Sequence, residues 1–375
     1  MKPAFEVADV LRNQRYRLNE LCANSWQLRT LQALSVCRTA ALGGHVDVCD
    51  NTSCGKLHIS YNSCRNRHCP KCQGHKRDEW MQAREKELFR TSYYHLVFTL
   101  PDDLNRLALH RPKLVYGLLF QTAWQVVKAF AANPKFIGAA PGMIAILHTW
   151  GQNLSLHPHL HCIVPGGGIN TSGKWKAARG KDKYLFPVKA MSGVFRAKYA
   201  EGLRANKLDA PKLYKSLFAR PWVVYCKQPF FGPRQVVEYL GRYTHKIAIS
   251  NHRIRSIENG QVTFAAKDYR RGGAKYLLSL TEEEFIRRFS LHILPRGFTR
   301  IRHYGILSST LKKVCVELLQ QELGRIKLPE RKDVHLLCPA CRKGKLVTIW
   351  RFNSRGPPPA DAQILKLMMQ LVKKP

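Results

Sequence analysis

Residues 157–161, His-Pro-His-Leu-His, place three imidazoles at alternate positions, and an apolar run from Cys162 to Val164 follows. Alternate side chains of a strand point to one face, so the three rings are expected to project together. His159 and His161 would lie about 7 Å apart along the backbone, a separation from which two imidazoles converge on one metal ion. His157 and His161 would lie about 13 Å apart, so a third ligand is expected from His95 or from His157 on a bent strand end.

The ion at such a site depends on what else binds it. Imidazole alone suits zinc, copper or iron better than magnesium. If the substrate is a phosphodiester, its oxygens and water would complete the shell, and magnesium or manganese becomes reasonable. The alternative is a solvent-facing polar strand whose histidines have no function, which three alternating histidines disfavour.

Two tyrosines four residues apart are candidate nucleophiles. Residues 233–243 read as a helix with Pro233 at its first position, which would place Tyr239 and Tyr243 side by side, about 6 Å apart. A phenol with a pKa of about 10 is a poor nucleophile at neutral pH, but a cation that stabilises charge on a phosphoryl group offsets this. The product would be a covalent tyrosyl ester. The alternative is that both rings pack at the edge of the core.

The cysteines indicate structural zinc, because seven of the twelve lie within the first 75 residues. Cys69 and Cys72 form a zinc half-site, and Cys49 with Cys54 is its expected partner in a tetrahedral thiolate site. A second site could be formed by Cys37, His45, Cys64 and His68. Cys338 and Cys341 form a further half-site that either takes ligands from elsewhere, with Cys315 and His335 as local candidates, or marks a turn.

The formal net charge of +37 points to a polyanionic partner. Basic residues are spread along the chain and interleaved with aromatic ones, and no isolated basic amphipathic helix carries them, which favours nucleic acid over a membrane surface. Binding is therefore expected to depend strongly on salt. The expected contacts to nucleic acid are Arg65, Arg67, Lys71, Arg242, Lys246, Arg270, Arg271 and Arg302.

No apolar run reaches the roughly 18 residues of a membrane span, and the first residues contain no signal-peptide core. We therefore expect a bacterial cytoplasmic, nucleoid-associated protein whose cysteines stay reduced.

The pattern of elements predicts an α+β fold. Strands are expected at 93–100, 142–150, 157–164, 247–249, 261–265 and 276–280, and helices at 78–89, 114–132, 191–206, 233–243 and 307–323. Thr281 and Glu284 form a capping box that starts one more helix. The expected units are a helical and zinc-binding domain (1–89), a mixed α and β domain that includes the tyrosine helix (90–250), a β-rich and helical extension (251–330) and a C-terminal CxxC element with a basic tail (331–375).

The combination of His159 and His161 with Tyr239 and Tyr243 resembles the two-tyrosine HUH endonucleases (histidine, hydrophobic, histidine). The chain is more closely similar to the rolling-circle transposases of the insertion sequence ninety-one family. The matching segments are 41–45, 62–72, 95–101, 157–168, 239–250, 269–270 and 301–305.

This resemblance implies an antiparallel-sheet nuclease core with the histidines on a central strand and the tyrosines on a facing helix. It implies that one tyrosine cleaves single-stranded DNA at an element end and keeps the 5′-phosphate, while the second serves the second cleavage, into target DNA. Mg²⁺ or Mn²⁺ at the nuclease site and structural Zn²⁺ are the expected metals. The alternatives are a replication initiator or relaxase of the same class, and a non-catalytic zinc-dependent nucleic-acid binder; the oligomeric state is not predicted.

Overall fold

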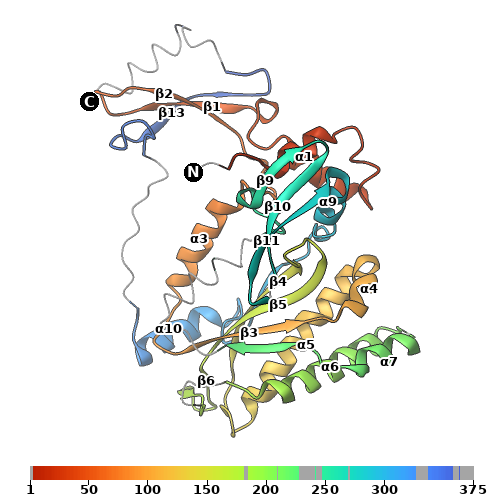
Figure 1. Ribbon diagram of the computed structural model, residues 1–375. Coiled ribbons are helices and arrows are strands. Elements are labelled where there is room, and N and C mark those ends of the chain that lie inside the picture. The colour runs from red at the N-terminus through yellow and green to blue at the C-terminus, as the bar shows by residue number, and fades with distance from the viewer. Residues whose placement is uncertain are drawn as a thin grey trace.

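The computed structural model describes residues 3–180, 185–208, 210–227, 241, 247–268, 271–326, 337–357 and 363. The helices are α1 (Val7–Asn13), α2 (Ser25–Ser35), α3 (Gln73–Glu85), α4 (Asn105–His110), α5 (Pro112–Ala132), α6 (Val188–Ala205), α7 (Pro211–Ala219), α9 (Glu282–Ser290) and α10 (Lys312–Leu323) (Figure 1). The strands are β1 (Gly44–Cys49), β2 (Leu57–Tyr61), β3 (Tyr93–Thr99), β4 (Gly142–Trp150), β5 (Leu156–Pro165), β6 (Gly167–Ile169), β7 (Trp175–Ala177), β8 (Val224–Lys227), β9 (Ile254–Glu258), β10 (Gln261–Asp268), β11 (Ala274–Thr281), β12 (Ile301–Gly305) and β13 (Leu346–Phe352). Short 3-10 turns lie at Ala40–Leu42, Asp102–Leu104 and Asn251–Arg253.

A five-stranded sheet in the order β12-β4-β5-β3-β8 forms the centre of the fold, and each neighbouring pair is antiparallel. The predicted α+β class and the predicted strands β3, β4 and β5 are confirmed. The strand with the alternating histidines, β5, is the middle strand, with β4 and β3 on its two sides. The histidines therefore lie at the centre of the sheet, where both neighbouring strands can contribute side chains to them.

The two faces of this sheet pack against different helices. On one face, Leu160 and Val164 join the core made with the apolar sides of α5 and α6. On the other face, which carries the histidines, Ile146 and Ile163 pack with Met81 of α3 and with α10. Because alternate residues of a strand point to opposite faces, the apolar residues of β5 between the histidines anchor the strand and leave the rings on the other side.

A second core joins the N-terminal helices to a small sheet in the order β11-β10-β9. Buried residues of α1 and α2 pack with Phe264 of β10 and Phe285 of α9. The Thr281 side chain accepts a hydrogen bond from the amide of Glu284 and caps α9, which is the threonine half of the predicted capping box. The Glu284 carboxylate accepts from Arg287 and Arg288.

A third sheet, in the order β13-β1-β2, brings together the two ends of the described chain. Gly44 of β1 is paired with Phe352 of β13 on one side and with Tyr61 of β2 on the other. Figure 1 shows this sheet apart from the central one, with α3 leading from the first toward the second. We refer to it as the cysteine-rich sheet, because its strands and turns carry four of the cysteines described below, Cys49, Cys54, Cys338 and Cys341.

Some sequence predictions differ from the structure. Residues 247–249 are buried but are not a strand, and α10 begins at Lys312 instead of residue 307. Helix α3 covers Gln73–Glu85, five residues earlier than expected at its start. The strand pairing also crosses two of the expected domain boundaries. β12 was expected in the extension, but it forms an edge of the central sheet. β13 was expected in a separate C-terminal element, but it pairs with β1. The predicted helix at 233–243 lies outside the described residues, except for Gly241.

Candidate active site and metal centres

Three histidines from two neighbouring strands converge on the central sheet. His159 and His161 of β5 are joined by His148 of β4, and one ring nitrogen of each lies within 4.8 Å of the others. The antiparallel register places His148 directly opposite His159, so both point to the same face. This spacing suits three ligands of one metal ion.

Neighbouring groups hold these rings. The Nδ1–H of His159 donates to the His157 carbonyl oxygen at 2.7 Å, because a carbonyl can only accept. This tautomer leaves the lone pair of His159 Nε2 for a metal ion. Nδ1 of His161 lies 2.9 Å from Nε2 of His95, and the His148 ring stacks on Trp150 with centroids 4.5 Å apart. Such outer contacts fix the orientation of metal ligands.

Burial also keeps His159 in the form that binds metal. It lowers the pKa of His159 to about 4, and it lowers the pKa of His157 as well. A histidine with a pKa near 4 is neutral at pH 7, and only the neutral imidazole can ligate a metal ion. The donor set therefore fits a divalent cation.

The third histidine differs from both sequence candidates. His95 contacts His161 from β3, and His157 contributes its carbonyl to His159, but neither ring is part of the three-histidine cluster. His148 was missed, although a signal existed: it is the one ionisable residue in the otherwise apolar segment Gly142–Trp150.

The two candidate nucleophiles, Tyr239 and Tyr243, lie outside the described residues. Gly241, which lies between them in sequence, is described and helical. A Cβ atom at Gly241 would lie 2.1 Å from Sδ of Met81, so the two residues are in close contact. Met81 belongs to the apolar cluster on the histidine face of the central sheet.

Four cysteines gather between α2 and α3. The sulfur of Cys37 lies 3.5 Å from the sulfurs of Cys69 and Cys72, and Cys64 lies 3.6 Å from Cys72. We call this the inner cluster, because Cys37, Cys69 and Cys72 are buried in the core formed by α1, α2 and α9. Contacts among the four sulfurs lower the pKa of Cys37 and of Cys72 and raise the pKa of Cys64 and of Cys69, so they favour the thiolate at two of the four positions.

Another four cysteines gather at one end of the cysteine-rich sheet, and we call them the outer cluster. They are Cys49, Cys54, Cys338 and Cys341, with the sulfur atoms within 4.8 Å of one another. Amide hydrogen bonds from Gly344 and Lys343 lower the pKa of Cys341 to about 6.

These clusters correct the predicted grouping of ligands. Cys69 and Cys72 are grouped with Cys37 and Cys64, and not with Cys49 and Cys54. The two histidines expected in a second site make other contacts: Nε2 of His68 accepts from the Leu294 amide at 3.1 Å, and Nε2 of His45 lies 3.3 Å from Asp47. Cys338 and Cys341 are not a turn alone, and Cys315 is not grouped with them; His335 lies outside the described residues.

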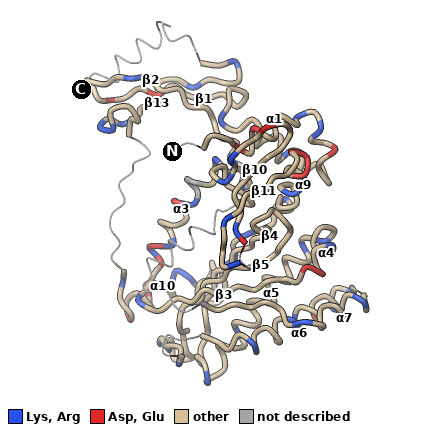
Figure 2. Tube along the Cα trace, in the orientation of Figure 1, with Lys and Arg blue, Asp and Glu red and all other residues tan. Residues whose placement is uncertain are grey.

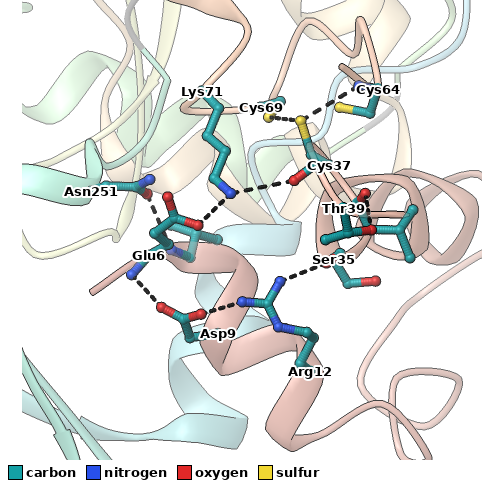
Figure 3. Close-up of polar contacts among 12 residues, drawn as sticks. Glu6, Asp9, Arg12, Ser35, Cys37, Thr39, Cys64, Cys69, Lys71 and Asn251 are labelled. Atoms are coloured by element: carbon teal, nitrogen blue, oxygen red, sulfur yellow. Dashed lines mark hydrogen bonds and ion pairs between the residues drawn. The ribbon is translucent and has the colours of Figure 1, made fainter. Parts of the chain in front are cut away.

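Several arginines and lysines expected to bind DNA have structural contacts instead. The Lys71 ammonium lies 2.5 Å from the Glu6 carboxylate and donates to the Cys37 carbonyl, as Figure 3 shows. Arg67 donates to the carbonyls of Leu294, Pro295 and Phe298, and Arg302 lies 4.3 Å from the centre of the Phe120 ring. Arg65 and Arg271 are exposed. Arg242, Lys246 and Arg270 lie outside the described residues.

This difference predicts opposite effects of two nearby substitutions. Arg65→Ala is expected to reduce the slope of log binding constant against log salt by about 1, because one phosphate contact is lost. Arg67→Ala is expected to lower the melting temperature and leave the salt slope unchanged, because its guanidinium is occupied by three carbonyls. Fluorescence anisotropy over a salt series, with thermal melts of both variants, checks this. A reduced slope for Arg67→Ala alone would contradict the assignment.

Comparisons with known proteins bear on the function of a chain that carries this histidine cluster and these two cysteine clusters. Residues 10–100 match a family model described as "Transposase zinc-binding domain". Residues 142–314 match one described as "Putative transposase". The first match covers the inner cluster, and the second covers the three histidines.

Two curated relatives extend over most of the chain. The "Putative transposase y4qJ" of Sinorhizobium fredii is 41% identical, and the alignment covers 94% of this chain and 97% of that protein. The transposase for insertion sequence element IS801 of Pseudomonas savastanoi pv. phaseolicola is 28% identical, with 80% and 74% covered. Among solved structures, the conjugative relaxase TrwC in complex with oriT DNA aligns with 62% of this chain and 72% of its own, at 12% identity and a TM-score of 0.24.

These matches place the protein in the class of transposases with an N-terminal zinc-binding domain. The chain belongs to the insertion sequence ninety-one (IS91) family of transposases, as the sequence resemblance implied. Within the described residues, no helix is long and apolar enough to span a membrane.

Proposed function

We propose that this transposase cleaves and rejoins single-stranded DNA at the ends of its element by a rolling-circle route, through a 5′-phosphotyrosine intermediate. The observation that carries the proposal is the cluster of His148, His159 and His161 on the central sheet of a transposase. Structural zinc sites have four protein ligands, whereas three ligands leave a position open for water or substrate, so a group of three histidines favours an enzyme over a zinc-dependent binder.

The three histidines would hold Mn²⁺ or Mg²⁺. The third ligand is a nitrogen and not an oxygen, which favours Mn²⁺ over Mg²⁺, because magnesium prefers oxygen ligands. When bound, the cation polarises the scissile phosphate and stabilises the negative charge that develops there. Trp150 and His95, which contact His148 and His161, would keep the imidazoles oriented.

Tyr239 and Tyr243 remain the proposed nucleophiles. A tyrosine oxygen attacks the phosphorus, the bond from phosphorus to the 3′ oxygen of the preceding nucleotide breaks, and the 3′ oxygen leaves with a proton in place of the one lost by the phenol. The tyrosyl ester keeps the bond energy, so a 3′-hydroxyl can later attack it and rejoin the strand. Gly241, which lies between the two tyrosines in sequence, contacts Met81 of the apolar cluster on the histidine face, and this contact supports the assignment.

The surroundings of the site suit a single strand. Tyr225 of β8 is 52% exposed and is paired with Val97, which is itself paired with His161. The tyrosine therefore lies on the histidine face, about 10 Å across two strands from His161, where a base could stack on it. Figure 2 shows Lys and Arg on the cysteine-rich sheet and around the central sheet alike, which suits a long phosphate backbone.

The proposal predicts a covalent protein–DNA adduct. Purified protein, mixed with Mn²⁺ and single-stranded oligonucleotides carrying an element end, is expected to form an adduct that survives denaturing electrophoresis. The Tyr239→Phe and Tyr243→Phe double variant is expected to form none, because no phenol is left to make the ester. Each single variant shows which residue makes the first cut. If no element-end oligonucleotide yields an adduct, the enzyme proposal is wrong and a binder remains.

A second prediction tests the contact between Gly241 and Met81. Gly241→Leu is expected to lower adduct formation by about tenfold, because the flexible Met81 side chain can move aside for a single methyl group but not for a whole leucine side chain. Met81→Ala in the same chain is expected to restore most of the rate, since it removes the overlapping sulfur. Lack of rescue, in protein whose melting temperature is unchanged, would contradict this contact.

A further inference from the structure

The outer cluster is assembled from segments almost 300 residues apart. Cys49 and Cys54 flank the turn after β1, and Cys338 and Cys341 lie in the turn before β13. The match to the transposase zinc-binding domain ends at residue 100, so it includes only the first two of these cysteines. Nothing in that match accounts for Cys338 and Cys341.

The sulfur positions fit a tetrahedral ion. Four thiolates bound at about 2.3 Å to one zinc ion lie about 3.8 Å apart along each edge of the tetrahedron. The sulfur of Cys49 lies 3.6 Å from that of Cys341, and the sulfur of Cys54 lies 3.9 Å from that of Cys338. A disulfide would need about 2.05 Å, and each of these cysteines is free.

The backbone around both cysteine pairs is arranged to present sulfur to a cation. In the second turn, the Gly344 amide donates to the Cys341 sulfur at 3.4 Å and the Cys338 amide donates to the Gly344 carbonyl at 2.7 Å. In the first, the amides of Cys54 and Gly55 both donate to the Asn51 carbonyl. Amide donors to sulfur favour the thiolate, which is the form that binds zinc.

The two turns also approach each other more closely than ordinary side chains allow. A Cβ atom at Gly344 would lie 2.5 Å from the Cys49 sulfur and 2.7 Å from Cβ of Asn51. The Lys345 amide donates to the Asp50 carboxylate at 2.7 Å, which fixes the turns to each other from the other side. Glycine at 344 therefore makes room for the four sulfurs to converge.

We propose that the outer cluster binds a second structural zinc ion, separate from the one in the inner cluster, and that this ion fastens β13 to β1. In this proposal Cys338 and Cys341 of the C-terminal CxxC supply two of the four ligands, and Cys49 and Cys54 supply the other two. The ion closes a small sheet whose apolar core, within the described part of the chain, has Val46, Val48 and Ile349 as its buried residues. Such a core is too small to hold a third strand without a further link.

The zinc would also preserve a cavity of about 610 Å³ on the same sheet. Its lining combines His45 and Arg65 from the N-terminal half with Thr348, Arg351 and Phe352 of β13. Loss of β13 from the sheet would remove one wall of this cavity. The attachment of β13 to the sheet can be measured directly, without an activity assay.

Metal content of the full-length protein tests the proposal. Wild-type protein, purified without chelator, is expected to contain two zinc ions per chain by plasma mass spectrometry, after subtraction of any ion that is lost in the triple variant His148→Ala, His159→Ala and His161→Ala. The double variant Cys338→Ser and Cys341→Ser is expected to contain one. Both positions are changed because Nε2 of His58 lies 3.4 Å from the Cys338 sulfur and could replace that ligand alone. Cys315→Ser, a cysteine outside both clusters, is the matched control and is expected to keep two.

Hydrogen exchange supplies the second readout. In the double variant the amides of β13 and of β1 facing it are expected to exchange at least about 100-fold faster, while those of β3, β4 and β5 keep wild-type rates, which shows that the chain is still folded. One zinc in the wild type, two in the double variant, or unchanged exchange of β13 would each overturn the proposal. A wild-type mass lower by two hydrogens, restored by reductant, would show a disulfide instead and would overturn it too.

Discussion

His148→Ala is expected to lower the rate of adduct formation by at least about 100-fold, as His159→Ala and His161→Ala should. The three rings present one nitrogen each within 4.8 Å, so each supplies a third of the protein ligands. Loss of one ligand weakens metal binding and with it the stabilisation of charge on the phosphate. The measurement is single-turnover adduct formation over a range of Mn²⁺ concentrations, beside Mn²⁺ affinity by electron paramagnetic resonance.

Two variants serve as controls for this result. His157→Ala is expected to stay within about threefold of wild type, because His159 is held by the His157 backbone carbonyl, which the substitution keeps. His95→Ala is expected to lower the rate of adduct formation by about tenfold, because it removes a contact to His161 and not a metal ligand. If His148→Ala formed the adduct at the wild-type rate and His95→Ala severely lowered that rate, the third ligand would be His95 and the assignment of His148 would be wrong.

Cys69→Ser is expected to lower the free energy of unfolding by at least about 3 kcal/mol, because it leaves buried thiolates without their cation. Cys69 is 1% exposed and lies in the core that joins α1 and α2 to α9. A loss of this size corresponds to a fall in melting temperature of roughly 6 to 12 °C. Circular dichroism melts with and without a strong chelator measure it.

Cys22→Ser is the matched control for this prediction, because Cys22 packs against the same core and belongs to neither cluster. It is expected to change the melting temperature little. The chelator should lower the wild-type melting temperature and have a smaller effect on Cys69→Ser, whose inner ion is already lost. Equal sensitivity of both proteins to the chelator would contradict an ion at the inner cluster.

The central strands could be predicted from sequence because their periodicity is local. Residues 142–150 form a mainly apolar run, and residues 157–161 alternate histidine with other residues before the apolar residues 162–164. Glycine follows the first segment and proline follows the second. The order of the strands is not local. No feature of the Ile301–Gly305 sequence specifies that this segment pairs with β4. A slightly polar strand has the same sequence pattern whether it forms the edge of this sheet or belongs to a separate domain.

The histidine site shows the same division. Alternation within one strand identified His159 and His161, but the third ring comes from the register between two strands, which places His148 opposite His159. Closeness in sequence favours His157, and a strand-like pattern favours His95. A histidine inside an apolar buried strand costs free energy unless it is bound, and this criterion points to His148.

The cysteine grouping was wrong for a related reason. Spacing identifies which two cysteines share a turn, as in Cys69 with Cys72 and Cys338 with Cys341, but it does not identify which turns meet. Closeness in sequence favoured Cys49 and Cys54 as partners of Cys69 and Cys72. The pairing of β1 with β13 decided otherwise, and it joins residues that only the tertiary fold brings together.

The pairing of β1 with β13 also sets an order of events during synthesis. Cys49 pairs with Leu346, and at about 5 to 20 residues per second a ribosome needs roughly 15 to 60 s to make the chain between them. The last strand of the central sheet, β12, ends at Gly305, about 40 residues before β13 begins at Leu346. Each newly made molecule therefore passes through a period in which β1 has a free edge, and its final strand docks only after translation has passed β13.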